Sequence, residues 1–192
     1  MFNVLVKLAP AESEFLSDVK SAMEQYFGDD QRRVEHALQV SMYAEELLSY
    51  VDADPVVVLS AAYLHDIGIH EAERKHGSSS GKWQEIEGPP VARDILERLS
   101  AEPSLLEHVL AIVAAHHTSG GVDSPEFRVI WDADALVNFA DVLPGKNDDQ
   151  IEAILNGHMV TESGYQLARR IFIKNTERHK TCLQGHRPKF LP

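Results

Sequence analysis

Apolar residues recur at intervals of three and four along most of the chain, and no segment shows the strict alternation that marks a half-buried strand. This pattern predicts an all-α protein, and no internal repeat interrupts it. We expect helices over residues 12–27, 30–51, 55–67, 89–99, 103–117, 124–143, 149–156 and 162–180.

The most apolar of these helices begins at Pro55 and reads PVVVLSAAYLHD. Asp54 supplies an N-cap, Pro55 suits the first helical turn, and Gly68 ends the helix. Because this helix is apolar on every side, we predict that it lies at the centre of the domain.

The segment 69–88, IHEAERKHGSSSGKWQEIEG, breaks the helical pattern because it is polar and rich in Ser and Gly. A polar stretch of this length inside a compact domain is usually functional or mobile. We therefore predict a lid or substrate loop here, with the next helix starting at Pro89 and Pro90.

The composition predicts one domain. The chain has 192 residues, of which 44% are hydrophobic and 25% charged, close to the globular average. We divide it into an N-terminal helix (1–29) that packs on the core, the core (30–143), C-terminal helices that complete the same domain (144–180) and a tail (181–192). The single Cys182 favours a reducing, cytoplasmic setting, and no apolar run is long enough to span a membrane.

The net charge of -12 argues against stable nucleic-acid binding, which depends on Lys and Arg. The charge is uneven, since residues 169–192 hold seven Lys and Arg residues and one Glu. We interpret this segment as a basic helix that docks on an acidic body, with a polyanion-binding tail as the alternative.

Several polar side chains occupy positions that the helical pattern assigns to the interior. They are His36, His65, Asp66, His116, His117 and Asp134. An unpaired carboxylate at the end of the most apolar helix would cost several kcal/mol, so Asp66 requires a cationic partner. Imidazole and carboxylate groups that converge from several helices are how helical bundles build metal sites.

The order of these residues along the chain resembles the motif order of a known protein family. RRVEHALQV, AAYLHDIG, EGPPVARDIL, IVAAHH and DADAL follow one another, so that a His, an adjacent His-Asp pair and a later Asp occur in sequence. Over residues 30–143 the chain resembles the HD-domain metal-dependent phosphohydrolase superfamily. The resemblance implies a single-domain helical bundle of the HD-domain type, with a metal bound by His36, His65, Asp66 and Asp134.

Within DADAL the resemblance favours Asp134, and the helical stripe agrees; Asp132 is left as a nearby carboxylate or the alternative ligand. Mixed His and Asp donors fit a divalent ion but do not distinguish Mn, Fe, Co, Ni, Zn and Mg. Four protein ligands on a six-coordinate ion leave room for water and a phosphoryl oxygen.

The activity implied by the resemblance is hydrolysis of a phosphate ester, in a small molecule or a nucleotide, by metal-activated water. Asp66 would both bind the metal and orient this water, while His116 and His117 would contact substrate or shuttle protons. Arg32 and Arg33 lie one turn before the first ligand and either bind a phosphate or are merely solvated.

The chain departs from the family pattern at two positions, which bear on the number of metal ions and on the substrate class. Members with a second metal use an extra His where this chain has Gln84, so a second ion is left open, with Glu85 or Glu87 as substitute donors. Members that cleave cyclic dinucleotides often carry Lys after HDIG, where this chain has Ile69, and that activity is disfavoured.

Two alternatives to a phosphohydrolase stay open. One is a di-iron oxygenase on the same scaffold, with which the adjacent residues His116 and His117 are compatible. The other is a non-catalytic module that senses a nucleotide. A homo-oligomer is compatible with either, because the sequence does not specify the oligomeric state.

Overall fold

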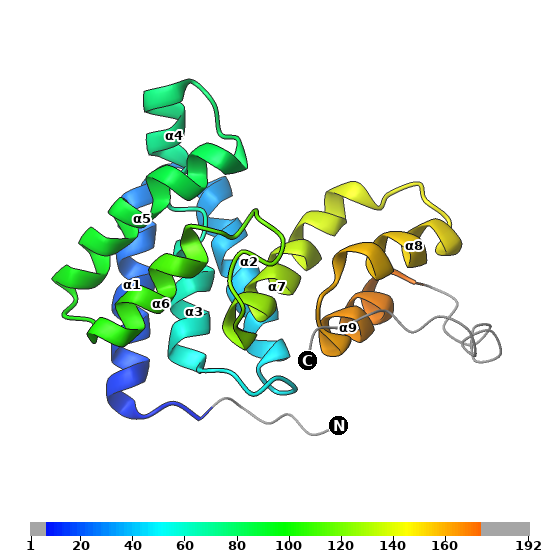
Figure 1. Cartoon of the computed structure of the whole chain (residues 1–192), viewed down its shortest axis with the longest axis horizontal. Helices are drawn as coiled ribbons and strands as arrows, with labels where there is room; N and C mark the ends of the chain where they lie inside the picture. The colour runs from blue at the N-terminus through cyan, green and yellow to red at the C-terminus, as the bar shows by residue number, and fades with distance from the viewer. Residues whose placement is uncertain (1–6, 174–192) are drawn as a thin grey trace.

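The computed structural model describes residues 7–173, and within that range the chain forms nine α-helices and no strand (Figure 1). The helices are α1 (Pro10–Phe27), α2 (Gln31–Leu47), α3 (Pro55–Leu64), α4 (Ile69–His76), α5 (Gly81–Arg98), α6 (Pro103–Val113), α7 (Pro125–Val142), α8 (Asp148–His158) and α9 (Glu162–Phe172). The prediction of an all-α fold is confirmed.

The apolar helix α3 is central, as predicted. It packs against α1, α2, α6 and α7, and seven of its ten residues are buried (Figure 1). The Asp54 carboxylate caps it by accepting hydrogen bonds from the backbone N–H groups of Val56 (2.8 Å) and Val57 (3.3 Å). The helix ends at Leu64, so the His-Asp pair lies in the turn that follows.

Helices α2 and α7 pack closely and run antiparallel. Arg32, near the start of α2, lines the same cavity as Asn138, near the end of α7. At the opposite ends, Glu46 of α2 and Arg128 of α7 line another cavity. This arrangement places the middle of each helix beside the turn that follows α3.

One buried carboxylate fixes α9 to α7. Asp132 has no exposed surface and accepts hydrogen bonds from the N–H groups of Val160 and Thr161, both at 2.9 Å, and from the Thr161 hydroxyl at 2.5 Å. Gly164 sits directly against this carboxylate, where any Cβ would collide with it. Burial raises the pKa of Asp132 to about 6, although these hydrogen bonds lower it.

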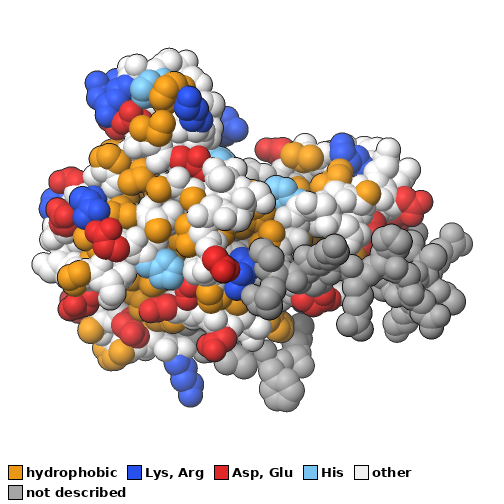
Figure 2. Space-filling model, viewed as in Figure 1, with side chains coloured by type: hydrophobic (Ala, Val, Ile, Leu, Met, Phe, Trp, Pro, Cys, Tyr) orange, Lys and Arg blue, Asp and Glu red, His pale blue; other side chains and the backbone are white. Residues whose placement is uncertain are grey.

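The segment 69–88 is not a loop, so that prediction is wrong. It forms α4 and the first part of α5 (Figure 1). In α4 the Glu71 carboxylate pairs with Arg74 (2.6 Å) and Lys75 (3.3 Å), and Ile69 and Ala72 are buried. Ion pairs three and four residues apart and a narrow apolar stripe stabilise this short helix despite its polar composition. Figure 2 shows Lys and Arg side chains gathered over this projecting helix.

Helix α5 passes through Pro89 and Pro90 instead of beginning there. The proline rings remove two N–H donors from the helix, but tertiary contacts hold the preceding turns in place. The Glu87 carboxylate, for example, accepts hydrogen bonds from Lys75 (2.5 Å) and His76 (2.8 Å) on α4. Tertiary packing therefore outweighs the tendency of Pro89 and Pro90 to interrupt the helix.

The start of α4 touches the backbone of α5 directly. A Cβ built on Gly68 would lie 2.5 Å from the backbone nitrogen of Gly88 and 2.7 Å from the carbonyl oxygen of Gln84. Only glycine fits this crossing, and it holds the His-Asp turn against α5.

The basic C-terminal segment is described only at its beginning. There Arg169 pairs with Glu152 at 3.0 Å and Arg170 pairs with Glu46, which agrees with a basic helix docked on acidic side chains. The rest of the predicted helix and the tail, residues 174–192, lie outside the described range. No helix among the described residues is long and apolar enough to cross a membrane.

We predict that Gly68→Ala lowers the free energy of unfolding by about 3 kcal/mol, because the added methyl group meets backbone atoms that cannot move aside. Gly157→Ala is the matched control: a Cβ at Gly157 in α8 meets nothing within 4 Å. That change should leave stability equal or raise it by up to about 1 kcal/mol. Urea unfolding followed by circular dichroism measures both, and equal stabilities for the two variants would contradict the close approach.

Candidate metal centre

His65 lies in the turn after α3 and is 1% exposed. Its Nδ1 lies 2.9 Å from the backbone carbonyl oxygen of Ala62, one of the carbonyls that a helix C-terminus leaves without a partner. Because a carbonyl can only accept, Nδ1 carries the proton. Nε2 then presents its lone pair to the interior, as a metal ligand does.

His116 repeats this arrangement at the end of α6. Its Nδ1 donates to the carbonyl oxygen of Val113 at 2.8 Å, which leaves Nε2 as the unprotonated nitrogen. That nitrogen is buried without a hydrogen-bond partner and lies 3.3 Å from Oδ1 of Asp66. A lone pair facing a carboxylate oxygen is repulsive, so this contact calls for a proton or a metal ion.

The antiparallel pair α2 and α7 supplies His36 and Asp134. Nε2 of His36 lies 3.0 Å from Oδ1 of Asp134 and 3.6 Å from Oδ2 of Asp66. Asn138, one helical turn after Asp134, donates a hydrogen bond of 2.9 Å to the same Oδ1 and orients that carboxylate. This residue was missed by sequence reasoning, although its spacing of four from Asp134 is a usable signal.

The four predicted ligands come together in the structure. Nε2 of His36 and Nε2 of His65 are 3.2 Å apart, and Nε2 of His65 lies 3.8 Å from oxygens of both Asp66 and Asp134. Ligands bound at about 2.1 Å and at right angles around one ion stand about 3 Å apart. The two imidazoles and two carboxylates therefore fit a divalent ion in spacing and in donor type.

The electrostatics of the cluster favour positive charge at its centre. Burial raises the pKa of Asp66, but the neighbouring imidazoles of His65, His116 and His36 outweigh this effect, and the pKa falls well below its usual range. The pKa of Asp134 is lowered in the same way, mainly by its hydrogen bond with His36 against the effect of burial. Both carboxylates are thus ionised and available to a cation.

The histidines respond to these carboxylates. Burial lowers the pKa of His36, but Asp134 and Asp66 raise it by a larger amount, so the net shift is upward. The pKa of His116 is also raised, because the effect of Asp66 exceeds that of burial. In His65 burial dominates, and its pKa is lowered. The most buried imidazole is therefore the one held neutral, which is the form that binds a metal.

A cavity of about 420 Å³ opens onto this cluster between α2 and α7. His36, Asp66 and Asp134 line it together with His117, so a ligand in the cavity would reach all four side chains. His116 is not one of the described residues that line the cavity; its Nε2 contacts Asp66 instead. Of the two histidines predicted to meet substrate, the structure brings only His117 to the cavity wall.

Arg32 and Arg33 both line the same cavity. Arg33 lies 3.7 Å from Glu73, whereas Arg32 is exposed and makes no ion pair with any described residue. The structure therefore leaves Arg32 available for an anion, while Arg33 is shared with α4.

Neither Glu85 nor Glu87 is placed to replace the missing histidine. Glu85 accepts hydrogen bonds from the N–H of His117 (3.0 Å) and from the Thr118 hydroxyl (2.9 Å), and Glu87 is paired with α4. Gln84 itself lines the cavity. A second group of donors does exist, because Asp66, His116 and His117 offer atoms within 4.8 Å of one another.

Asp132 points away from this cluster. Two residues correspond to about 200° around a helix, so Asp132 and Asp134 lie on opposite faces of α7. The Asp132 carboxylate is fully engaged with α9. Of the two aspartates in DADAL, Asp134 is the one that contacts the histidines.

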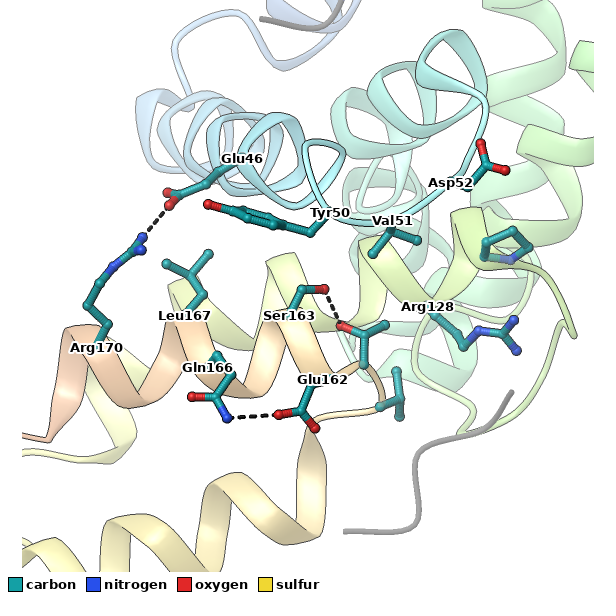
Figure 3. A pocket seen from close by; sticks show the side chains of 13 residues that line it. Glu46, Tyr50, Val51, Asp52, Arg128, Glu162, Ser163, Gln166, Leu167 and Arg170 are labelled. Atoms are coloured by element: carbon teal, nitrogen blue, oxygen red, sulfur yellow. Dashed lines mark hydrogen bonds and ion pairs between the residues drawn. The ribbon is translucent and has the colours of Figure 1, made fainter. Parts of the chain in front are cut away.

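A second cavity, of about 740 Å³, lies at the other end of α2 (Figure 3). Tyr50, Arg128 and Leu167 are among its lining residues, and none of the eight predicted site residues is. Some of its polar side chains pair with one another, as Arg170 does with Glu46 and Gln166 with Glu162 (Figure 3). The larger cavity is therefore separate from the chemistry.

A family model of the HD domain matches residues 33–138, more than half of the chain, which therefore belongs to the HD-domain family. HD domains bind divalent metals and are typically metal-dependent hydrolases. A predicted HD superfamily hydrolase from an uncultured Thermotogales bacterium has a similar crystal structure, with a TM-score of 0.55 and 25% identity over 82% of this chain and 83% of the other. No curated protein matched. The resemblance inferred from the sequence is confirmed.

We predict that the protein purified without chelators holds about one equivalent of a divalent metal ion, and that His65→Ala loses it because a central nitrogen ligand is removed. His158→Ala, which alters an exposed histidine of α8, is the matched control and should keep the metal. Elemental mass spectrometry measures the content. Full metal retention in His65→Ala would contradict the ligand assignment.

Proposed function

We propose that the protein is a divalent-metal-dependent phosphohydrolase that cleaves a phosphate monoester. The observation that carries the proposal is the open side of the ligand cluster: Asp66 and Asp134 line a cavity that is also lined by Arg32, an exposed cation with no ion pair to any described residue. A phosphate dianion fits between a metal and an arginine. A purely structural ion needs no such access.

A bound divalent ion would supply Lewis-acid chemistry, lowering the pKa of water and neutralising charge on the phosphate. The chain's own residues provide the positioning. Asp66 offers Oδ2 toward His36 (3.6 Å) and His65 (3.8 Å) while Oδ1 faces His116 (3.3 Å). His116 thus fixes the carboxylate that orients the attacking water.

Hydrolysis forms a bond from the water oxygen to phosphorus and breaks the bond from phosphorus to the leaving oxygen. The water loses a proton, and the leaving oxygen gains one. His117 is the imidazole on the cavity wall, and partial burial lowers its pKa, so at neutral pH it is the unprotonated base that can accept the proton of the water. We assign the proton transfer to His117 and the holding of Asp66 to His116.

A di-iron oxygenase is the second candidate, and the donor group formed by Asp66, His116 and His117 favours it specifically. Gln84 weighs against it, since an amide replaces the histidine that a second metal would use. Two equivalents of iron with oxygen consumption would support the oxygenase, whereas one equivalent with phosphate release supports the phosphohydrolase.

We place this chemistry in the cytoplasm because the sequence has a single cysteine and cannot form an internal disulfide.

We predict that Asp66→Ala reduces phosphatase turnover at least 1,000-fold while the protein stays helical, because both a ligand and the group that orients water are lost. Asp94→Ala changes an exposed carboxylate on α5 and should retain wild-type turnover. Phosphate release from p-nitrophenyl phosphate, measured with each added divalent metal, tests both. Full turnover in Asp66→Ala would refute the proposed mechanism.

We also predict that Arg32→Gln raises KM by about tenfold or more with little change in kcat, because a charge-assisted hydrogen bond to phosphate contributes about 1.5–3 kcal/mol. Arg98→Gln, on the exposed face of α5, is the matched control. Steady-state kinetics on the same ester separates the two parameters. An unchanged KM in Arg32→Gln would show that this side chain is only solvated.

A further inference from the structure

The cavity beside the metal cluster is small and polar. Its volume of about 420 Å³ is near the lower end for small-molecule pockets. Its walls are the sides of α2 and α7, together with Ser79 and Gln84 from the α4–α5 region. These walls belong to packed helices, so the space is set by the fold.

The wall beyond the metal ligands lacks a platform for a nucleobase. Among the described residues that line it there is no Phe, Tyr or Trp; its only aromatic rings are those of His36 and His117, at the metal cluster. Proteins that recognise bases commonly stack them on aromatic side chains. This cavity offers amides and carboxylates instead: Gln39, Gln84, Asn138, Glu35 and Asp141.

Gln84 presents a fixed acceptor. Its side chain is 6% exposed, and Nε2 donates a 2.7 Å hydrogen bond to the backbone oxygen of Ser79. That bond fixes which end of the amide is which, so the other atom is the oxygen, and this Oε1 is buried without a partner. A phosphate dianion has no hydrogen to give it, whereas a hydroxyl group does.

Among the described residues that line the cavity, Arg32 and Arg33 are the only Lys or Arg side chains. Arg33 already lies 3.7 Å from Glu73, while Glu35 and Asp141 line the cavity as carboxylates. One phosphate group can be neutralised here, at the metal cluster and Arg32. A second or third phosphate would meet negative side chains, which disfavours diphosphates and triphosphates.

We propose that this pocket takes the phosphate monoester of a small, hydroxyl-rich molecule, such as a sugar or polyol phosphate, and not a nucleotide. The proposal rests on the phosphohydrolase function proposed above. The phosphate lies at the metal cluster and Arg32, and hydroxyl groups of the leaving portion donate to Gln84 and contact Gln39. Hydrolysis releases the free polyol and inorganic phosphate.

Ribose 5-phosphate and AMP form a matched pair, because they share the ribose and its 5-phosphate and differ by the base. We expect kcat/KM for ribose 5-phosphate to exceed that for AMP at least tenfold in the metal-loaded protein. Equal or better hydrolysis of AMP overturns the proposal and leaves the phosphohydrolase function intact.

A binding measurement keeps the two proposals distinguishable. If neither ester nor p-nitrophenyl phosphate is hydrolysed with any divalent metal, the proposed function fails, and calorimetric titration of the same protein with ribose 5-phosphate and AMP still decides the ligand class. Tighter binding of ribose 5-phosphate, at least tenfold, supports the pocket assignment. Tighter or equal binding of AMP overturns it.

Variants locate the hydroxyl contacts. Gln84→Met keeps the length of the side chain and removes its amide, both the Oε1 acceptor and the Nε2 donor to Ser79. Gln39→Leu removes the amide at an exposed position where folding is not at risk. Each should lower kcat/KM for ribose 5-phosphate at least fivefold more than for p-nitrophenyl phosphate, with metal content unchanged. Gln166→Leu, on α9 and remote from this cavity, is the control and should alter neither. Loss of metal in Gln84→Met, or equal loss on both esters in Gln39→Leu, contradicts the assignment.

Discussion

Two backbone carbonyls decide the chemistry of the centre. A helix C-terminus leaves carbonyl oxygens without partners, and at the ends of α3 and α6 those of Ala62 and Val113 take the Nδ1 protons of His65 and His116. Each ring is thereby fixed in one tautomer with its Nε2 lone pair directed inward. The carboxylates of Asp66 and Asp134 lie close to these lone pairs and would repel them, so the arrangement is stable only with a cation between them.

Much of the fold could be predicted because its signals are local. Asp54 caps α3 as expected, the helix predicted from residue 124 forms with Ser124 as its cap, and the uniformly apolar α3 is central. The polar composition of residues 69–88 and the two prolines that follow them predict a loop, whereas the spacing of Glu71, Arg74 and Lys75 favours the helix that forms. The contacts that carry α5 through Pro89 and Pro90 join residues distant in sequence, and periodicity does not show them.

The candidate site divides along the same line. The helical stripes indicate that His36, His65, Asp66 and Asp134 point inward, and the structure brings them together. The sequence does not distinguish the roles of the two adjacent histidines, because only the folded arrangement brings His116 against Asp66 and His117 to the cavity wall. The lone acceptor of Gln84 depends on a hydrogen bond to Ser79, which no pattern of residue types reveals.

Helix α7 carries carboxylates to both of its sides. Asp134 faces the histidines, while Asp132, half a turn away, holds the amides of Val160 and Thr161 at the start of α9. A rotation of α7 about its axis would move both carboxylates together. The amide hydrogens of Val160 and Thr161 are therefore natural reporters for nuclear magnetic resonance: filling the site should slow their exchange with solvent, although neither residue contacts a ligand.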